Sequence, residues 1–143
     1  ENWSAGRATS LALGAQEVVS KHDASISAED AVLIQNVDQP TSMRIVRQLF
    51  DTLVGSRANI VQPFYFDSEG QEHGGHPVVV RGDVAAELVG VSEDTAGLRS
   101  VMQRHQVERV STDDQNIVGL NLNTPQSVEV ARQIFGESRN VVQ

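Results

Sequence analysis

The chain has 143 residues, 39% of them hydrophobic, which suits a single domain with one core. Its net charge of -8, with only 11 lysines and arginines, argues against a nucleic-acid partner, because binding to a phosphate backbone needs clustered positive charge. The lack of cysteine excludes disulfides and thiolate metal sites, no apolar run is long enough for a membrane partner, and we expect a cytoplasmic protein.

The first residues predict a helix followed by a buried strand. Glu1-Asn2-Trp3 lacks an initiator Met, so we expect an N-terminally incomplete chain. Apolar residues at helical spacing predict a helix from about Thr9 to Lys21. The apolar run Ala31–Ile34 predicts a strand that continues to Asp38, because Pro40 cannot donate a ladder hydrogen bond.

The rest of the chain alternates helices with short, nearly all-apolar strands. The next expected elements are a helix over Met43–Val54 capped by Thr41 or Ser42, a strand over Ala58–Phe66 entering a hairpin, a strand or helix lead-in over Val78–Val80, and a helix over Asp83–Val89. They are followed by a helix that carries Leu98, Val101, Met102 and His105 and is capped by Asp94 or Thr95, an edge strand over Gln106–Ser111, a last strand over Ile117–Leu122, and a final helix that Thr124-Pro125 opens and Gly136 closes.

This order of elements predicts the α/β class. Nearly continuous apolar strands are typical of a sheet covered by helices on both faces. We therefore expect residues 1–143 to form one domain with a doubly wound, mostly parallel sheet.

Asp38 is the first candidate for chemistry. Open α/β sheets bind ligands beyond the carboxyl ends of their strands, where this carboxylate is expected. Mg²⁺ is held in proteins by one or two carboxylates together with substrate phosphates. Asp38 is equally suited to accepting backbone hydrogen bonds at the turn, and both roles remain open.

Two further motifs follow strands and precede helices or strands. Asn121 and Asn123 could face the same cleft as Asp38 and orient water or phosphate, although Asn123 or Thr124 could instead simply cap a helix. Gly74-Gly75-His76-Pro77 allows close approach of the backbone to a ligand, and His76 could donate a hydrogen bond or be structural.

The segment Arg7 to Ser10 is the last candidate. It could form a helix N-terminus whose free N–H groups favour an anion or the polar edge of a base. The alternative is an ordinary capped helix.

Taken in chain order, these motifs resemble the MobA-like NTP transferases, relatives of the molybdenum cofactor cytidylyltransferases and guanylyltransferases. Gly6–Gly14 is similar to the family's glycine, serine, glycine helix, and Val32–Pro40 is similar to its strand ending in Asp-Gln-Pro. Gly75–Val78 resembles its Gly-His-Pro element, while Asp94–Arg99 and Asn121–Pro125 resemble its small helix and its closing strand-turn-helix.

The resemblance implies a Rossmann-like domain of the nucleotide-diphospho-sugar transferase type. It implies transfer of NMP from CTP or GTP to a phosphorylated acceptor such as a molybdopterin cofactor, with Mg²⁺ as cofactor and pyrophosphate as leaving group. Asp38 would hold the metal and Asn123 would complete the metal site. Arg7 and Ser10 would contact the nucleotide. The acceptor side would be formed by Gly75, His76 and Pro77.

Two departures from the family keep alternatives open. The opening strand and Gly-rich triphosphate loop of the family do not occur in this sequence, so the N-terminal βα unit is absent from it. Asn121 and Asn123 stand where cytidylyl-type members usually carry aspartates, which leaves CTP versus GTP open. One alternative is an inactive relative that acts as a nucleotide-binding or assembly module and covers its sheet edge as a homo-oligomer or by strand exchange. Another is a flavodoxin-like binder that needs no metal.

Overall fold

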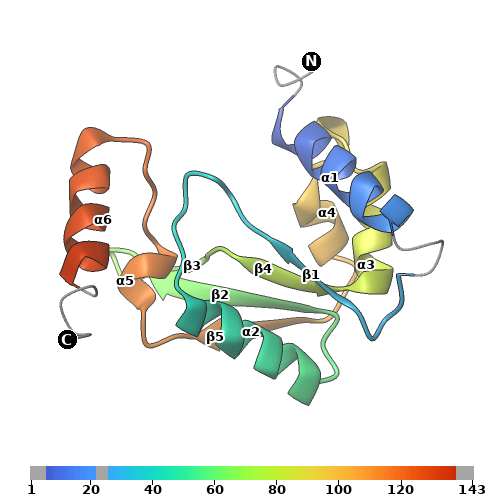
Figure 1. The fold of residues 1–143 in the computed structure, drawn as a ribbon, viewed down its shortest axis with the longest axis horizontal. Helices are drawn as coiled ribbons and strands as arrows, with labels where there is room; N and C mark the ends of the chain where they lie inside the picture. The colour runs from blue at the N-terminus through green and yellow to red at the C-terminus, as the bar shows by residue number, and fades with distance from the viewer. Residues whose placement is uncertain (1–5, 22–25, 138–143) are drawn as a thin grey trace.

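The structure is a computed structural model that describes residues 6–21 and 26–137. The predicted N-terminal segment Glu1-Asn2-Trp3 lies outside the described residues. The elements in chain order are α1 (Arg7–Lys21), β1 (Ala31–Ile34), α2 (Met43–Gly55), β2 (Ile60–Phe66), β3 (Glu72–Gly74), β4 (Val78–Arg81), α3 (Gly82–Glu87), the 3-10 turns η2 (Leu88–Gly90) and η3 (Glu93–Thr95), α4 (Leu98–Met102), β5 (Val107–Ser111), α5 (Gln115–Val118) and α6 (Pro125–Glu137) (Figure 1).

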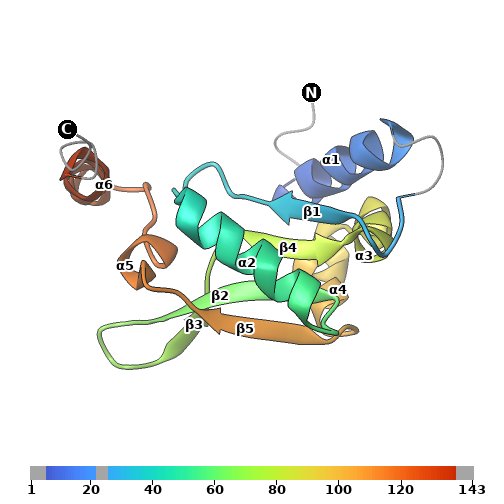
Figure 2. The same cartoon turned by 60° about the horizontal axis from the view of Figure 1, so that its bottom comes forward.

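The strands form a five-stranded sheet in which β4 lies between β1 and β2. β4 pairs antiparallel with both of these strands, β3 pairs antiparallel with β2, and β5 pairs parallel with β2. The strands β1, β2 and β5 therefore point the same way, whereas the β4 arrow points against those of β1 and β5 (Figure 2).

The α/β class is confirmed, but the expectation of a mostly parallel sheet is not. Three of the four pairings in the described sheet are antiparallel. The reason is the short connection from β2 through β3 to β4, since a parallel connection needs a crossover of roughly a dozen residues or more. The longer connection from β1 to β2 contains α2 and joins two strands that point the same way.

Helices cover both faces of the sheet, as the apolar strands predicted. One buried cluster joins Val78 and Val80 of β4 to α1, α3 and α4, and the other joins Val79 to α2 and α5. The alternation arises because successive side chains of a strand point to opposite faces. β4 is consequently buried on both sides, with its three valines fully covered.

Two predictions for the second half of the chain were wrong. The apolar run predicted as a strand over Ile117–Leu122 instead begins within the short helix α5, where the N–H of Ile117 donates to the carbonyl of Asp114 at 2.9 Å. Ile117 and Val118 are both buried, and a short buried run does not by itself distinguish helix from strand. The helix predicted to carry His105 ends at Met102.

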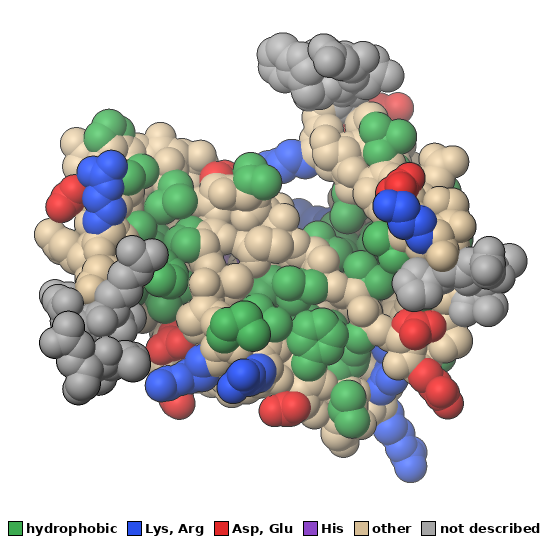
Figure 3. All heavy atoms as spheres, viewed as in Figure 1, with side chains coloured by type: hydrophobic (Ala, Val, Ile, Leu, Met, Phe, Trp, Pro, Cys, Tyr) green, Lys and Arg blue, Asp and Glu red, His purple; other side chains and the backbone are tan. Residues whose placement is uncertain are grey.

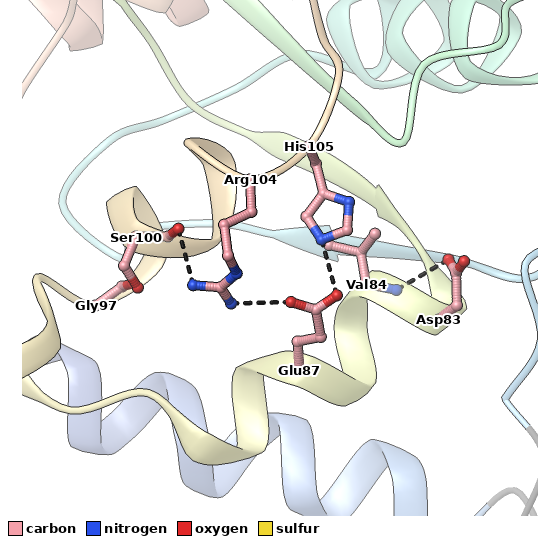
Figure 4. A network of polar contacts seen from close by, with 7 residues as sticks. All are labelled: Asp83, Val84, Glu87, Gly97, Ser100, Arg104 and His105. Atoms are coloured by element: carbon pink, nitrogen blue, oxygen red, sulfur yellow. Dashed lines mark hydrogen bonds and ion pairs between the residues drawn. The ribbon is translucent and has the colours of Figure 1, made fainter.

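A surface network fixes the end of α3 to the segment after α4 (Figure 4). Glu87 accepts from Arg104 at 2.9 Å and lies 2.8 Å from the Nε2 atom of His105. These hydrogen bonds, that of Arg104 first, lower the pKa of the Glu87 carboxyl below its ordinary value. Arg104 also donates to the carbonyl of Ser100, so the network links α3, α4 and the segment after α4.

Arg81, at the end of β4, organises the C-terminus of α2. Its guanidinium donates to the carbonyls of Leu53 at 2.8 Å, Ser56 at 3.0 Å and Ala58 at 3.0 Å. The last carbonyls of a helix have no partner within the helix, and a cation there also opposes the helix dipole. A single side chain therefore caps α2 and attaches it to the sheet.

We predict that Arg81→Met lowers the free energy of unfolding by about 2–3 kcal/mol, because it keeps the aliphatic stem but removes several charge-assisted hydrogen bonds. Arg47→Met on the exposed face of α2 is the matched control and should change stability by less than about 0.5 kcal/mol. Urea denaturation followed by circular dichroism measures both. Equal stability of the two variants would show that the Arg81 contacts contribute nothing.

Candidate functional site

A cleft of about 720 Å³ lies between α1 and β1. Four residues singled out in the sequence line it: Arg7, Ser10, Asp38 and Asn123. They come from the first helix, the turn after β1 and the loop before α6, which are far apart in the chain. The space-filling view shows a hollow beside α1 with hydrophobic side chains along it (Figure 3).

Asp38 lies in a turn and not at the end of a strand, because β1 ends at Ile34. After Ile34, side-chain hydrogen bonds take the place of strand pairing. The amide of Asn36 donates to the side chain of Gln39 at 2.6 Å, and the side chain of Gln35 donates to the carbonyl of Asn36 at 2.9 Å. The turn holds Asp38 half-buried at the mouth of the cleft. Asp38 therefore lies beside a cleft, although the predicted strand end is wrong.

The loop before α6 is attached directly to this turn. The N–H of Leu122 donates to the carbonyl of Asp38 at 2.7 Å. Within the loop, the side chain of Asn121 accepts from the N–H of Asn123 at 2.9 Å, which makes an Asx turn. Asn121 therefore shapes the loop, and Asn123 is the asparagine that reaches the cleft.

Thr124 caps α6, as predicted. Its side-chain oxygen accepts from the N–H of Ser127 at 3.1 Å. The alternative in which Asn123 serves as the cap is thereby excluded.

His76 faces a second, smaller cleft of about 300 Å³ that shares Arg7, Leu11, Ile34 and Asn36 with the first. Burial lowers the pKa of His76 below its ordinary value of 6.5, and the charge of Arg7 lowers it further. A hydrogen bond with the backbone of Ile34 and the charge of Asp38 act in the opposite direction.

The Nδ1 atom of His76 is buried and has no hydrogen-bond partner among the described residues. An unsatisfied buried polar atom is costly unless a ligand or water completes it. In a purely structural role, protein groups would satisfy both ring nitrogens of His76. The described residues leave Nδ1 without such a group.

The N-terminus of α1 is occupied by the protein itself. The carboxylate of Glu93 accepts from the N–H of Ala8 at 2.7 Å. The expectation of free N–H groups available to an anion at Arg7–Ser10 is therefore wrong at Ala8. The exposed side chains of Arg7 and Ser10 still line the cleft.

Gly75 and Pro77 are buried and do not line either cleft, so they flank the site without reaching it. A Cβ atom at Gly75 would overlap the side chain of Val118, and the N–H of Gly75 donates to the carbonyl of Pro63 at 2.8 Å. Gly75 therefore permits close packing against α5. Its predicted direct role toward an acceptor is not supported by this position.

Two residues of the site were not singled out from the sequence. Asn36 lines both clefts, and Arg99 adds a second guanidinium to the smaller one. Arg99 lies in the Asp94–Arg99 segment that carries part of the family resemblance, so a signal for it was present. Nothing in the spacing of Asn36 distinguishes it from an ordinary turn residue.

The donor set for a metal is limited. Within the part of the chain that the structure describes, no three His, Asp or Glu side chains gather closely enough to form a metal site by themselves. Asp38 supplies one carboxylate and Asn123 one amide oxygen to the same cleft. This set fits Mg²⁺, which takes few protein ligands and completes its coordination with water and phosphate oxygens.

We predict that the free energy of unfolding falls as the pH drops below about 6.5. The pKa of His76 is lower in the folded chain than in the unfolded chain, so the unfolded chain binds a proton at this ring first. His76→Gln should reduce the loss of stability between about pH 7.5 and about pH 5.5. Denaturant unfolding at the two pH values measures the difference, and an NMR titration of the His76 ring should give a midpoint below 6.5. An unchanged pH slope in the variant would contradict the prediction.

Comparison with known proteins supports the fold. No family model matches the chain, and no curated protein matches it. Among solved structures, the crystal structure of molybdopterin-guanine dinucleotide biosynthesis protein A from Archaeoglobus fulgidus is similar, with a TM-score of 0.54 and 16% sequence identity. The similarity covers 75% of this chain and 56% of that one.

This likeness concerns the fold alone, and the chain spans little more than half of the solved structure's length. The chain thus resembles a MobA protein in its fold, as the order of its sequence motifs predicted.

In the described residues, no helix is long and apolar enough to cross a membrane.

Proposed function

We propose that the chain carries the metal and acceptor side of a magnesium-dependent nucleotidyltransferase. The reaction moves NMP from CTP or GTP to a small phosphorylated acceptor, such as a molybdopterin cofactor, and releases pyrophosphate. The observation that supports this proposal is the meeting of Arg7, Ser10, Asp38 and Asn123 in one cleft. The printed name of the similar structure, molybdopterin-guanine dinucleotide biosynthesis protein A, agrees with such a substrate pair.

Asp38 and Asn123 are the proposed ligands of Mg²⁺. When bound, the ion would neutralise charge on the nucleotide phosphates and so favour attack by the acceptor phosphate. Asp38 is suited to this role because the hydrogen bond from Leu122 fixes its backbone and the half-buried residue lines the cleft. A ligand whose backbone is fixed needs less reorganisation to bind a cation than one on a free loop.

The remaining side chains position the two substrates. The Arg7 guanidinium is exposed in both clefts and can pair with phosphate oxygens, while the Ser10 hydroxyl can hydrogen-bond the nucleotide. His76 and Arg99 line the smaller cleft together with Glu93, whose carboxylate already accepts from Ala8, so the Arg99 guanidinium is suited to an anionic acceptor. Because the smaller cleft shares its wall with the larger one, the two substrates would meet beside Arg7.

A second candidate is a nucleotide-binding or assembly module without catalysis. It agrees with the limited donor set of the cleft, to which Asp38 supplies one carboxylate and Asn123 one amide oxygen. The two candidates share nucleotide binding and differ in turnover. We accordingly expect residues 1–143 alone to bind a nucleotide weakly and to transfer it at a very low rate.

We predict that Asp38→Asn weakens magnesium-dependent binding of CTP or GTP by about tenfold or more. The reason is that an interaction with a charged group contributes about 1.5–3 kcal/mol to binding. Isothermal titration calorimetry with CTP and with GTP, each in the presence and absence of Mg²⁺, measures the dissociation constants. Asp51→Asn on the exposed side of α2 removes one carboxylate elsewhere and is the matched control.

The control should bind the nucleotide as the unaltered chain does. Nucleotide binding that is independent of both Mg²⁺ and Asp38 would contradict the proposed metal site and favour the metal-free binder. Release of pyrophosphate in the presence of a phosphorylated pterin, even at a low rate, would contradict the non-catalytic module.

A further inference from the structure

The smaller cleft, of about 300 Å³, is bordered by four segments of the described chain. The start of α1 and the end of β1 form two of its walls, and the loop before β4 and the segment from η3 into α4 form the others. α1 and α4 pack into one buried cluster on the same face of the sheet (Figure 1). The volume lies at the lower end of the range for small-molecule pockets, so this cleft suits a compact ligand.

The ring of His76 offers a hydrogen-bond acceptor at this cleft. The ring is hydrogen-bonded to the backbone of Ile34, and the nitrogen without a partner among the described residues is Nδ1. The bond to Ile34 is therefore made by Nε2, which donates its hydrogen to the carbonyl. A neutral imidazole carries a single N–H, so Nδ1 keeps a lone pair. The partner that His76 lacks is thus a hydrogen-bond donor.

Glu93 adds a second acceptor to the same cleft. One oxygen of its carboxylate, Oε1, accepts from the N–H of Ala8 at 2.7 Å. An ionised carboxylate can accept up to about four hydrogen bonds, so Glu93 can accept further ones from a ligand. The contact with Ala8 also holds this side chain in place beside the cleft.

The positive side chains of the cleft are available to an anion. Arg7 and Arg99 line it, and neither guanidinium makes a hydrogen bond or an ion pair with another described residue. Arginine has only donors and pairs well with phosphate oxygens. The cleft therefore combines donors for a phosphate with acceptors for O–H or N–H groups. An anion without such groups would leave the acceptors unused.

A flat aromatic ligand is less suited to this cleft than an aliphatic one. The described lining residues include no Phe, Tyr or Trp, on which ring systems commonly stack. The apolar part of the lining is small or aliphatic and consists of Ala8, Leu11, Ile34, Ala96, Gly97 and Leu98. A polyol or sugar presents hydroxyl donors together with C–H groups, and so matches both kinds of wall.

We propose that the smaller cleft binds the phosphate monoester of a small hydroxylated aliphatic molecule, a polyol or a sugar. The guanidiniums of Arg7 and Arg99 bind the phosphate. Nδ1 of His76 and the carboxylate of Glu93 accept from hydroxyl groups and so determine specificity. This inference rests on the proposed function, which places a phosphorylated acceptor in this cleft, and it narrows the chemical class of that acceptor.

The test compares glycerol 3-phosphate with n-propyl phosphate, which has the same carbon chain without hydroxyl groups. Both are titrated into the isotope-labelled full chain at about pH 8, where His76 is neutral, and NMR follows the backbone amides of residues 96–99. Glycerol 3-phosphate should bind about tenfold more tightly, because a hydrogen bond to an otherwise unpaired buried group changes Kd by up to about this factor.

Two variants separate the hydroxyl contacts from the phosphate contacts. His76→Gln keeps an N–H for the carbonyl of Ile34 but lacks the acceptor at Nδ1. It should reduce the preference for glycerol 3-phosphate to about threefold or less and leave the Kd of propyl phosphate unchanged. Arg99→Met should weaken both phosphates about tenfold. Arg47→Met on α2 is the matched control and should bind both as the unaltered chain does.

The unaltered chain alone can overturn the proposal, by binding the two phosphates equally or by showing no shift of the 96–99 amides up to about 50 mM of either. Full preference in a folded His76→Gln variant would also overturn it and would assign Nδ1 to an ordered water. Tighter binding of a phosphorylated pterin at the same amides would assign the cleft to a flat ring. Neither a nucleotide nor Mg²⁺ is present, so failure here is distinguishable from failure of the Asp38 test.

Discussion

The antiparallel pairing of β1 with β4 is the constraint on which the candidate site depends. The register places Ile34, the last residue of β1, opposite Val78, the first residue of β4. Because the two strands run in opposite directions, the turn after β1 and the loop before β4 must leave the sheet at the same end. This brings Asp38 and His76 close enough for their charges to interact. A parallel arrangement of these neighbours would have separated the two motifs by the length of a strand.

Much of the fold was predictable from local patterns in the sequence. Ser42 caps α2 and accepts from the N–H of Ile45 at 3.2 Å, and the helical spacing after it located the helix. The direction of β4 was not predictable in this way, because the pairing partner of an apolar strand is set by connection length and tertiary packing. Ile117 illustrates the same limit, since a buried helical turn and a buried strand have the same composition.

The candidate site was predictable to the extent that its residues lie in loops with recognisable motifs. Asp38, Asn123 and His76 were found because such motifs mark where ligands approach a sheet. The contact of Glu93 with the N-terminus of α1 joins residues 85 positions apart in the chain, and no local pattern predicts it. The same reason applies to Gly75, whose closeness to Val118 depends on where α5 packs.

The two parts of the cleft are physically coupled. Arg7 and Asp38 lie in the same cleft as the apolar residues beside β1, so a ligand that covers these apolar residues would remove water from one side of the polar site. Electrostatic interactions strengthen as water is excluded, because the effective dielectric constant falls. A ligand seated against the apolar part of the cleft would therefore increase the attraction of Asp38 for a cation and of Arg7 for phosphate without altering either residue.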